Sequence, residues 1–323
     1  MSLYLARRLL QAALVMLAMS LIVFVGVYAI GDPVEILISP DADQMERERA
    51  IKALGLDLPL WMQYLSFLGN ALRGDLGRSF VFNEPALQLI LQRMPATLEL
   101  ALGATFMALI IGIPLGLYAG LKPKSPIAKT IMTGSILGFS LPTFWVGLMM
   151  IMVFAVQLGW LPSTGRGQTV EVLGLRWSFL TRDGLAHLAM PALNLALFKI
   201  SLVIRLTRAG VRETMLMDFV KFARAKGLTN QRVIFVHVFK NIMIPVVTVV
   251  GLELGSTIAF SVVTESVFAW PGMGKLIIDS INVLDRPVIV AYLMIIVMMF
   301  ITINLLVDLS YSALDPRVRL ENK

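Results

Sequence analysis

The chain has 323 residues, of which 57% are hydrophobic and only 15% are charged, and its mean hydropathy is +0.80. This composition excludes an ordinary soluble globular domain and indicates an integral membrane protein. The absence of cysteine excludes disulfides and thiolate metal sites. The net charge of +7 is explained by lysine and arginine in membrane loops, so no nucleic-acid partner is expected.

Six runs with few or no charges are long enough to cross a lipid bilayer, which takes about 20 residues. Their apolar residues do not alternate with a period of two, which favours helices over the strands of a membrane barrel. The runs are Leu9–Ile30, Leu100–Leu121, Thr130–Gly159, Leu185–Ile204, Asn241–Thr264 and Val288–Val307. The sequence therefore predicts an all-α, polytopic membrane protein with six transmembrane helices.

Two of these runs need a further interpretation. Thr130–Gly159 is too long for one upright span, so we expect a kink at Pro142 or an end that lies along the membrane interface. The first run follows Arg7 and Arg8, as the apolar region of a signal peptide does. Because it is longer than such a region and no small-residue cleavage site follows, we interpret it as a retained helix.

Lysine and arginine are unevenly divided between the two sides of the six spans. If the N-terminus lies inside, the inside segments carry a net charge of +12 and the outside segments −3. The inside segments are 1–8, 121–129, 205–240 and 310–323, and the outside segments are 31–97, 160–184 and 265–287. Because cytoplasmic loops are enriched in lysine and arginine, both termini are predicted to be cytoplasmic.

The predicted spans divide the chain into three parts. They are residues 1–30 with the first helix, 31–97 as a long periplasmic loop, and 98–323 as a core with five helices. In the long loop, Asp41–Leu54 predicts a charged helix and "LPLWMQYLSFLGNAL" (58–72) an amphipathic one. The simpler interpretation places the second helix along the outer membrane interface. The alternative makes it a lid or docking surface over a pore.

The inside loop 205–240 is basic and contains "KFARAKG" (221–227), in which basic residues alternate with small ones. A helix with small residues can enter a groove of another protein with its backbone close to that partner. Alternatively, the basic residues only fix the topology and contact anionic lipid. Composition leaves both interpretations open.

This loop and several other motifs resemble one family. "ARAKGL" (223–228) and "IPVVT" (244–248) resemble the cytoplasmic coupling loop of ABC importer permeases, more narrowly of the dipeptide/oligopeptide/nickel group. The long gap between Gly227 and Pro245 suits that group, and Lys221 stands where the general permease motif has its first glutamate. Further similar segments are "GDP" (31–33), "LGLDLPLWMQY" (54–64), "GDLGRSF" (74–80), "PATLEL" (95–100), "FAWPGMGKL" (268–276) and "LDPRVR" (314–319).

The resemblance implies a function and a set of partners. The chain would be the first of two permease subunits in the inner membrane of a bacterium, forming a heterodimeric pore for ATP-driven import of a peptide or similar solute. Its partners would be a second permease subunit, two ATP-binding subunits that hold ATP and magnesium, and a periplasmic solute-binding protein. Coupling would run through the 221–232 loop, by way of Phe222, Ala223, Arg224, Ala225, Lys226, Gly227 and Leu228.

No nucleotide site is expected in this chain. "GMGKL" (272–276) is similar to a phosphate-binding loop, but Ala269 stands at the position of the first glycine. Leu276 stands where serine or threonine would bind magnesium. A tight turn at Pro271 and Gly272 is the better interpretation of this segment.

The chain is also predicted to be no enzyme and to hold no metal or other cofactor. His187 and His237 lie on opposite sides of the predicted membrane, so they cannot share a metal ion or activate one serine. No predicted span has an aspartate in its interior, which excludes a pair of intramembrane catalytic aspartates.

Two ionisable residues, Lys199 and Glu253, lie inside predicted spans, where such residues are often functional. We expect a structural ion pair between the fourth and fifth spans. In the rival interpretation they form the relay of a proton-coupled secondary transporter, although no inverted repeat typical of such carriers is evident. Pro245 is expected to mark a kink or turn near the start of the fifth span.

Overall fold

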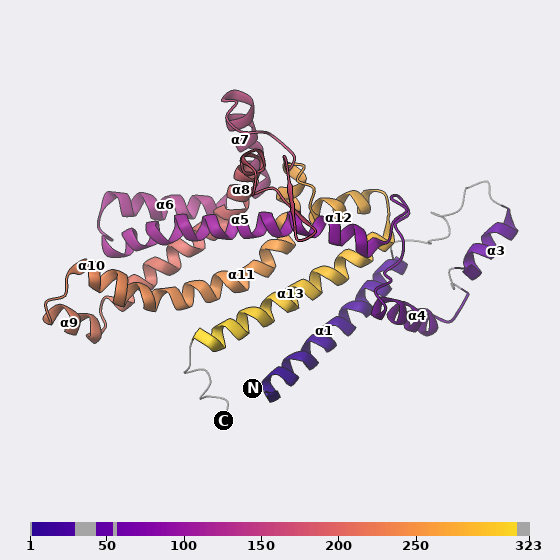
Figure 1. The fold of residues 1–323 in the computed structure, drawn as a ribbon, viewed down its shortest axis with the longest axis horizontal. Coiled ribbons are helices and arrows are strands. Elements are labelled where there is room, and N and C mark those ends of the chain that lie inside the picture. Colours follow the sequence, from indigo (N-terminus) through magenta and orange to yellow (C-terminus); the bar gives the residue numbers. More distant parts are fainter. Residues whose placement is uncertain (1, 30–42, 54–56, 315–323) are drawn as a thin grey trace. The chain divides into compact units, whose positions relative to one another are not determined.

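The computed structural model describes residues 2–29, 43–53 and 57–314, and most of these residues are helical (Figure 1). Within the described residues, five helices are long and apolar enough to cross a membrane, and one bent pair of helices supplies a sixth span if it is counted as one. The prediction of a mostly helical, multi-span membrane protein is therefore confirmed. "GDP" (31–33), Gly55 and residues 315–319 lie outside the described residues.

The internal contacts of the chain define two units. Unit 1 comprises residues 1–94 and 276–301, and unit 2 comprises residues 95–275 and 302–323. The helices of unit 1 are α1 (Ser2–Ala29), α3 (Gln44–Ala53), α4 (Leu60–Leu72), the start of α5 (Ala86–Leu121), most of α12 (Met273–Asn282) and the first half of α13 (Arg286–Leu314). The charged and the amphipathic helix predicted in the long loop correspond to α3 and α4.

In unit 1, α4 packs against α1 through aromatic side chains. The ring of Phe24 lies 5.3 Å from that of Tyr64 and 6.0 Å from that of Phe67. The hydroxyl of Tyr64 shares a hydrogen bond of 2.9 Å with Ser20. These contacts hold the amphipathic helix along α1, with Trp61 and Leu65 exposed on its other side.

The "GDLGRSF" segment of unit 1 forms a turn around Asp285, which is fully buried. The hydroxyl of Ser79 and the backbone N–H of Phe80 both donate to its carboxylate. Gly77 has φ of +88° and lies against Pro287, where an added Cβ would be 3.3 Å from the proline ring. Glycine meets both the backbone conformation and the close approach at this position.

Unit 2 is built around α8, against which α6, α7 and α11 pack. Its elements besides parts of α5, α12 and α13 are α6 (Pro126–Ser140), α7 (Thr143–Met150), the π-helix η1 (Ile151–Gln157), β1 (Val170–Val172), β2 (Leu175–Trp177), α8 (Arg182–Thr214), α9 (Asp218–Ala225), α10 (Asn230–Arg232), the π-helix η2 (Val233–Val238) and α11 (Phe239–Val267). Pro245 lies inside α11 and does not end the helix.

Three glycines of α5, spaced four residues apart, lie against α8. A Cβ added to Gly112 would be 2.7 Å from Val203, one added to Gly116 2.6 Å from Thr207, and one added to Gly120 2.6 Å from Val211. No side chain fits at these distances. The glycine stripe therefore lets the two helix backbones approach closely, as small residues do in membrane helix pairs.

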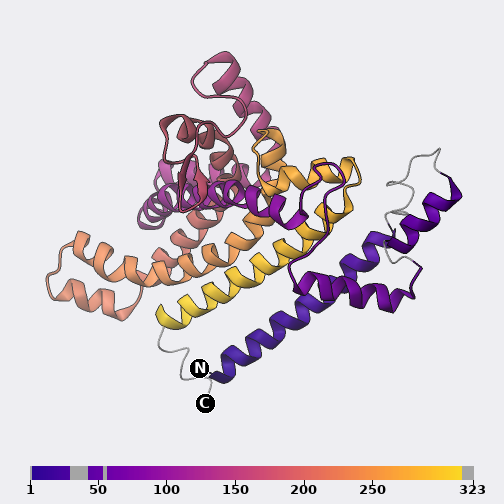
Figure 2. The same ribbon diagram turned by 45° about the vertical axis from the view of Figure 1, so that its right-hand side comes forward.

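The third predicted span is broken. Ser125 caps α6 by accepting a hydrogen bond of 3.0 Å from the N–H of Ala128. Leu141 is extended with ψ of 137°, which fits a residue that precedes a proline. Pro142 then stands at the N-cap of α7, and the helix pair is bent there by 106°. As a result α7 points away from α6 in Figure 1, and it projects from unit 2 in Figure 2. The break falls where the sequence predicts a kink.

One short hairpin departs from the all-α prediction. Strands β1 and β2 are antiparallel, with Val170 opposite Trp177 and Val172 opposite Leu175. The two residues between them, Leu173 and Gly174, have φ of 56° and 75°. Positive φ at both central positions is typical of the type I′ turn that joins two-residue hairpins.

Candidate functional site

The basic loop contains α9, a short amphipathic helix at one end of unit 2 (Figure 1). Val220 and Ala223 are buried in the same apolar cluster as residues of α5, α8 and α11. Phe222 is 61% exposed on the opposite side, and the ammonium of Lys226 lies 4.6 Å from the centre of its ring. Ala223, which the resemblance places among the coupling residues, therefore packs into its own chain, whereas Phe222, Arg224, Ala225, Lys226 and Gly227 are exposed.

Gly227 ends α9 in a fixed geometry. Its φ is +77°, its N–H donates to the carbonyl of Arg224, and the N–H of Leu228 donates to the carbonyl of Ala223. This pair of bonds is a Schellman motif, which favours glycine because only glycine adopts the left-handed conformation without strain. The glycine of the loop motif is thus a helix cap.

A second helical segment follows the cap. The hydroxyl of Thr229 caps α10, and the chain continues as the π-helix η2 into α11. Val233 and Val238 of η2 are fully buried in the cluster that holds α9, whereas Phe235 is 65% exposed. The π-helical register, which is common at functional sites, thus leaves an aromatic side chain on the surface of the loop.

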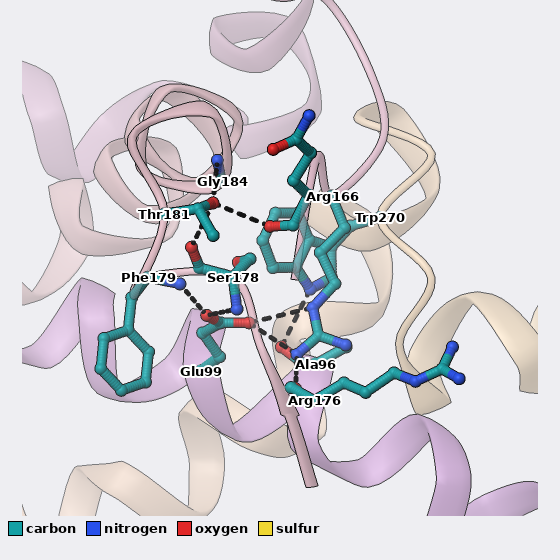
Figure 3. Close-up of polar contacts among 10 residues, drawn as sticks. Ala96, Glu99, Arg166, Arg176, Ser178, Phe179, Thr181, Gly184 and Trp270 are labelled. Atoms are coloured by element: carbon teal, nitrogen blue, oxygen red, sulfur yellow. Dashed lines mark hydrogen bonds and ion pairs between the residues drawn. The ribbon is translucent and has the colours of Figure 1, made fainter. Parts of the chain in front are cut away.

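At the other end of α8, the side chain of Glu99 on α5 forms a buried polar cluster (Figure 3). It is here called the outer clasp because the charge division of the sequence predicts that this end lies outside. The guanidinium of Arg166 donates to Oε2 of Glu99 from Nε at 3.0 Å and from Nη2 at 2.8 Å. The backbone N–H groups of Ser178 and Phe179 donate to Oε1 at 2.7 and 2.6 Å. The carboxylate, whose side chain is 1% exposed, therefore has four donors from the segment after η1.

Arg166 and Trp270 extend the clasp. Arg166 also donates to the carbonyl of Arg176 in β2, and its guanidinium lies 6.0 Å from the ring of Trp270. The indole N–H of the fully buried Trp270 donates to the carbonyl of Ala96 at 2.9 Å. The "PATLEL" and "FAWPGMGKL" motifs are thus in direct contact.

The start of α8 is joined to the same cluster. The hydroxyl of Thr181 accepts from the N–H of Gly184 at 2.8 Å and donates to the carbonyl of Gln168 at 2.8 Å. A Cβ added to Gly184 would be 2.1 Å from the carbonyl oxygen of Ser178. The loop therefore lies against the helix cap, with no room for a side chain at Gly184.

The side chain of Glu265 occupies the turn formed by "GMGKL" (272–276), the segment that is similar to a phosphate-binding loop. Its carboxylate is fully buried and accepts from the hydroxyls of Thr97 at 2.8 Å and Ser261 at 2.9 Å. It also accepts from the N–H of Lys275 at 2.9 Å. A Cβ added to Gly272 would lie 2.3 Å from this carboxylate. The backbone cradle at the start of α12 thus holds a carboxylate of its own chain, in keeping with the affinity of helix N-termini for anions.

The predicted ion pair between Lys199 and Glu253 is not formed, although both residues are among those that the structure describes. The ammonium of the buried Lys199 donates to the hydroxyl of Thr105 at 2.9 Å. The carboxylate of Glu253 accepts from the hydroxyl of Ser256 at 2.7 Å, one turn along its own helix. Each charge has a hydroxyl partner closer than the other charge, and only a longer-range attraction acts between them.

The sequence interpretation missed the outer clasp and the glycine stripe. The stripe has a local signal, because "GIPLGLYAG" (112–120) repeats glycine every fourth residue. The clasp has none, because Glu99 is 67 residues from Arg166 and 79 from Ser178 along the chain.

Comparisons with known proteins agree with the motifs. Residues 112–320 match the family described as "Binding-protein-dependent transport system inner membrane component", and residues 1–101 match the N-terminal membrane component of such systems. The oligopeptide transport system permease protein AppB of Bacillus subtilis is 39% identical over 98% of this chain and 99% of its own length. The dipeptide transport system permease protein DppB of Escherichia coli K12 is 36% identical over 98% of each chain.

Among solved structures, a chain of the inward-facing MetNI methionine ABC transporter is similar, with a TM-score of 0.57 at 17% identity. The match covers 72% of this chain and 99% of that chain, and at this identity it supports the fold alone. The two family matches together cover most of the sequence. The chain therefore belongs to the binding-protein-dependent transport system inner membrane components, the multi-pass permease subunits of bacterial ABC importers, whose ATP hydrolysis resides on partner subunits.

Proposed function

We propose that this chain forms one half of the pore of an ATP-driven importer of dipeptides or oligopeptides. The relatives named as oligopeptide and dipeptide permeases support this substrate class, because they match over nearly the whole length of both chains. A second permease subunit, two ATP-binding subunits and a periplasmic solute-binding protein complete the transporter. The match to permeases of binding-protein-dependent transport systems disfavours the rival proton-coupled carrier that would use Lys199 and Glu253.

The observation that carries the proposed coupling is the two-sided character of α9. Its buried side belongs to the core of α8 and α11, while its exposed side presents Phe222, which is 61% exposed, beside three basic residues. An exposed aromatic ringed by cations is the kind of anchor that fills a pocket on a partner protein. We therefore place the ATPase contact on Phe222, Arg224, Ala225, Lys226 and Gly227.

The proposed orientation places α9 in the cytoplasm, as the +12 and −3 charge division favours. The chain has no cysteine, so each introduced cysteine is its only thiol. Single cysteines at Thr229 and Lys124 should react with a membrane-impermeant maleimide only from the cytoplasmic side, and cysteines at Asp43 and Glu171 only from outside. Labelling of Thr229 from outside, or of Glu171 from the cytoplasm, would overturn the orientation.

Placing a carboxylate on the exposed face of α9 should uncouple transport. Ala225 is exposed, so Ala225→Glu leaves the packing of α9 intact while it puts a bulky carboxylate, opposite in charge to the basic face, into the ATPase contact. A penalty of at least ~1.4 kcal/mol there lowers productive docking about tenfold. The measurement is ATP-dependent uptake of a labelled dipeptide by proteoliposomes that contain the full set of subunits and a protonophore.

The matched control is Lys124→Gln, which changes the net charge by the same amount on the other basic inside loop. We expect parental uptake from this control, and parental levels of inserted protein from both variants. Normal coupled uptake by Ala225→Glu would refute the coupling assignment. Abolition of parental uptake by the protonophore at constant ATP would refute ATP-driven import itself.

A further inference from the structure

Unit 2 contains a cavity of about 880 Å³ to which the proposed transport function has assigned no role. It lies between the middle of α5, the segment around η1, and the first turns of α8. Leu102, Phe106 and Ile110 form one wall along α5, and each is at least half exposed toward the mouth. Leu185 and Ala189 of α8 form the opposite wall. The volume lies within the range of about 300–1,000 Å³ that ligand sites have.

The interior of the cavity is apolar. Among the described residues that line it, Glu99 alone is charged, and its carboxylate is turned toward the four donors of the outer clasp. A peptide in this cavity would lose the hydrogen bonds that its amides make with water and gain none, which is unfavourable. The lining therefore suits a hydrocarbon chain.

The depth of the cavity matches one leaflet of a bilayer. Its lining on α5 runs from Glu99 to Ile111, which is about 18 Å at 1.5 Å per residue. This is roughly half of the ~30 Å hydrocarbon core. Because the lining residues belong to the outer ends of two predicted spans, the cavity faces the outer leaflet in the proposed orientation.

The outer rim carries the features that a phospholipid headgroup needs. Trp177 and Phe179 lie at this rim, and aromatic side chains are typical of the membrane interface. Arg182 precedes Leu185 by three residues on α8, so its side chain lies on the same face, one turn farther out. Arg182 is exposed, and no ion-pair partner is present for it among the described residues. A phosphate above the cavity would meet this cation.

We propose that the cavity binds an acyl chain of an outer-leaflet phospholipid whose phosphate is held by Arg182. The apolar walls bind the chain, the aromatic rim lies at the glycerol level, and the guanidinium selects for the phosphate. The occupant of the cavity would brace the segment that carries the outer clasp.

Photoaffinity labelling tests this site directly. The full chain, purified with its co-purifying subunits, is placed in nanodiscs with a phosphatidylglycerol that bears a diazirine in its acyl chain. Labelled peptides are quantified for residues 99–111 and 185–193, and for α6, whose Ile127, Ile136 and Leu137 are exposed apolar residues. We expect stronger labelling of the cavity segments than of α6.

Arg182→Gln provides the decisive variant, because an exposed arginine is replaced without a change in the core. It should lower cavity labelling about fivefold, the contribution of one basic residue near a membrane surface, and leave α6 labelling unchanged. Arg182→Lys should retain the labelling. A diazirine diacylglycerol, which lacks the phosphate, should label the cavity of the parent about fivefold less than the phospholipid does.

Two outcomes would overturn the proposal. Equal labelling by the two probes, unaffected by Arg182→Gln, would show that the cavity holds only unselected lipid. A photoreactive benzoylphenylalanine at Phe106 that crosslinks to another subunit would show that a protein covers the cavity. Both outcomes leave dipeptide uptake untouched, so the lipid site and the proposed function can fail separately.

Discussion

Replacing Glu99 by alanine is expected to lower the free energy of unfolding by about 3–5 kcal/mol, because breaking one partner of a buried ion pair leaves the other charge uncompensated. The side chains of Arg166 and Glu99 are 12% and 1% exposed, so water cannot replace the hydrogen bonds that Arg166 loses when the carboxylate is removed. The N–H groups of Ser178 and Phe179 lose their acceptor as well. The segment between η1 and α8 should therefore detach from α5.

The measurement is a denaturant titration in mixed micelles followed by circular dichroism, with Glu171→Ala as the control. Glu171 is an exposed glutamate of β1, in the segment between η1 and α8. Its replacement should change the free energy of unfolding by less than about 0.5 kcal/mol. The double variant Glu99→Leu, Arg166→Leu removes both charges and should recover part of the loss. Recovery should stay incomplete, since the two backbone amides remain unpaired. Parental stability of Glu99→Ala would contradict the clasp.

Adding a single methyl group at Gly116 should destabilise the protein by about 1–3 kcal/mol, the usual cost of overpacking. The new Cβ would lie 2.6 Å from the Cβ of Thr207 and 2.8 Å from the carbonyl oxygen of Ile204. The second of these atoms belongs to the backbone, so α5 and α8 must separate to admit the methyl group. Because the two helices pack along a stripe of three glycines spaced four residues apart, the separation also loosens the contacts at Gly112 and Gly120.

Gly134→Ala is a control for which the opposite change in the free energy of unfolding is expected. Gly134 lies in α6 with no atom within 4 Å of an added Cβ, so Gly134→Ala should stabilise the helix by up to about 1 kcal/mol through the higher helix propensity of alanine. Gly103→Ala, whose Cβ would meet Ala192 at 3.5 Å, should be close to neutral. The same titration ranks the three variants. Equal effects of Gly116→Ala and Gly134→Ala would contradict close packing of the stripe.

The features that the sequence predicted correctly have local causes. Hydropathy finds the spans because each apolar run needs no partner to be recognised, and Pro142 marks the break because proline changes its own backbone. The resemblance to ABC importer permeases is confirmed for the same reason, since each motif is contiguous. The apolar run Leu100–Leu121 covers only the later part of α5, which begins at Ala86, because apolarity marks the membrane and not the end of a helix.

The features that were missed depend on distant residues or on rare backbone states. Glu99 meets donors 67 to 80 residues away, and no local pattern indicates them. The hairpin turn has Leu173 at a positive φ where asparagine or aspartate is usual, so the common turn signal is absent. The ion pair predicted from Lys199 and Glu253 was wrong because the hydroxyls of Thr105 and Ser256, invisible to a search for opposite charges, are nearer.

The packing and the cap of α9 determine how a displacement of this helix by a partner would be transmitted to α8 and α11. Val220 and Ala223 share one buried cluster with Val211 of α8 and Val246 of α11, and the Schellman motif at Gly227 fixes the reversal that follows. A helix that is packed and capped in this way is rigidly attached to α8 and α11, whereas a flexible loop would not be. If a partner displaced the exposed face of α9, the ends of α8 and α11 would therefore move with it as one rigid body, because little of the displacement would be absorbed by bending of the loop.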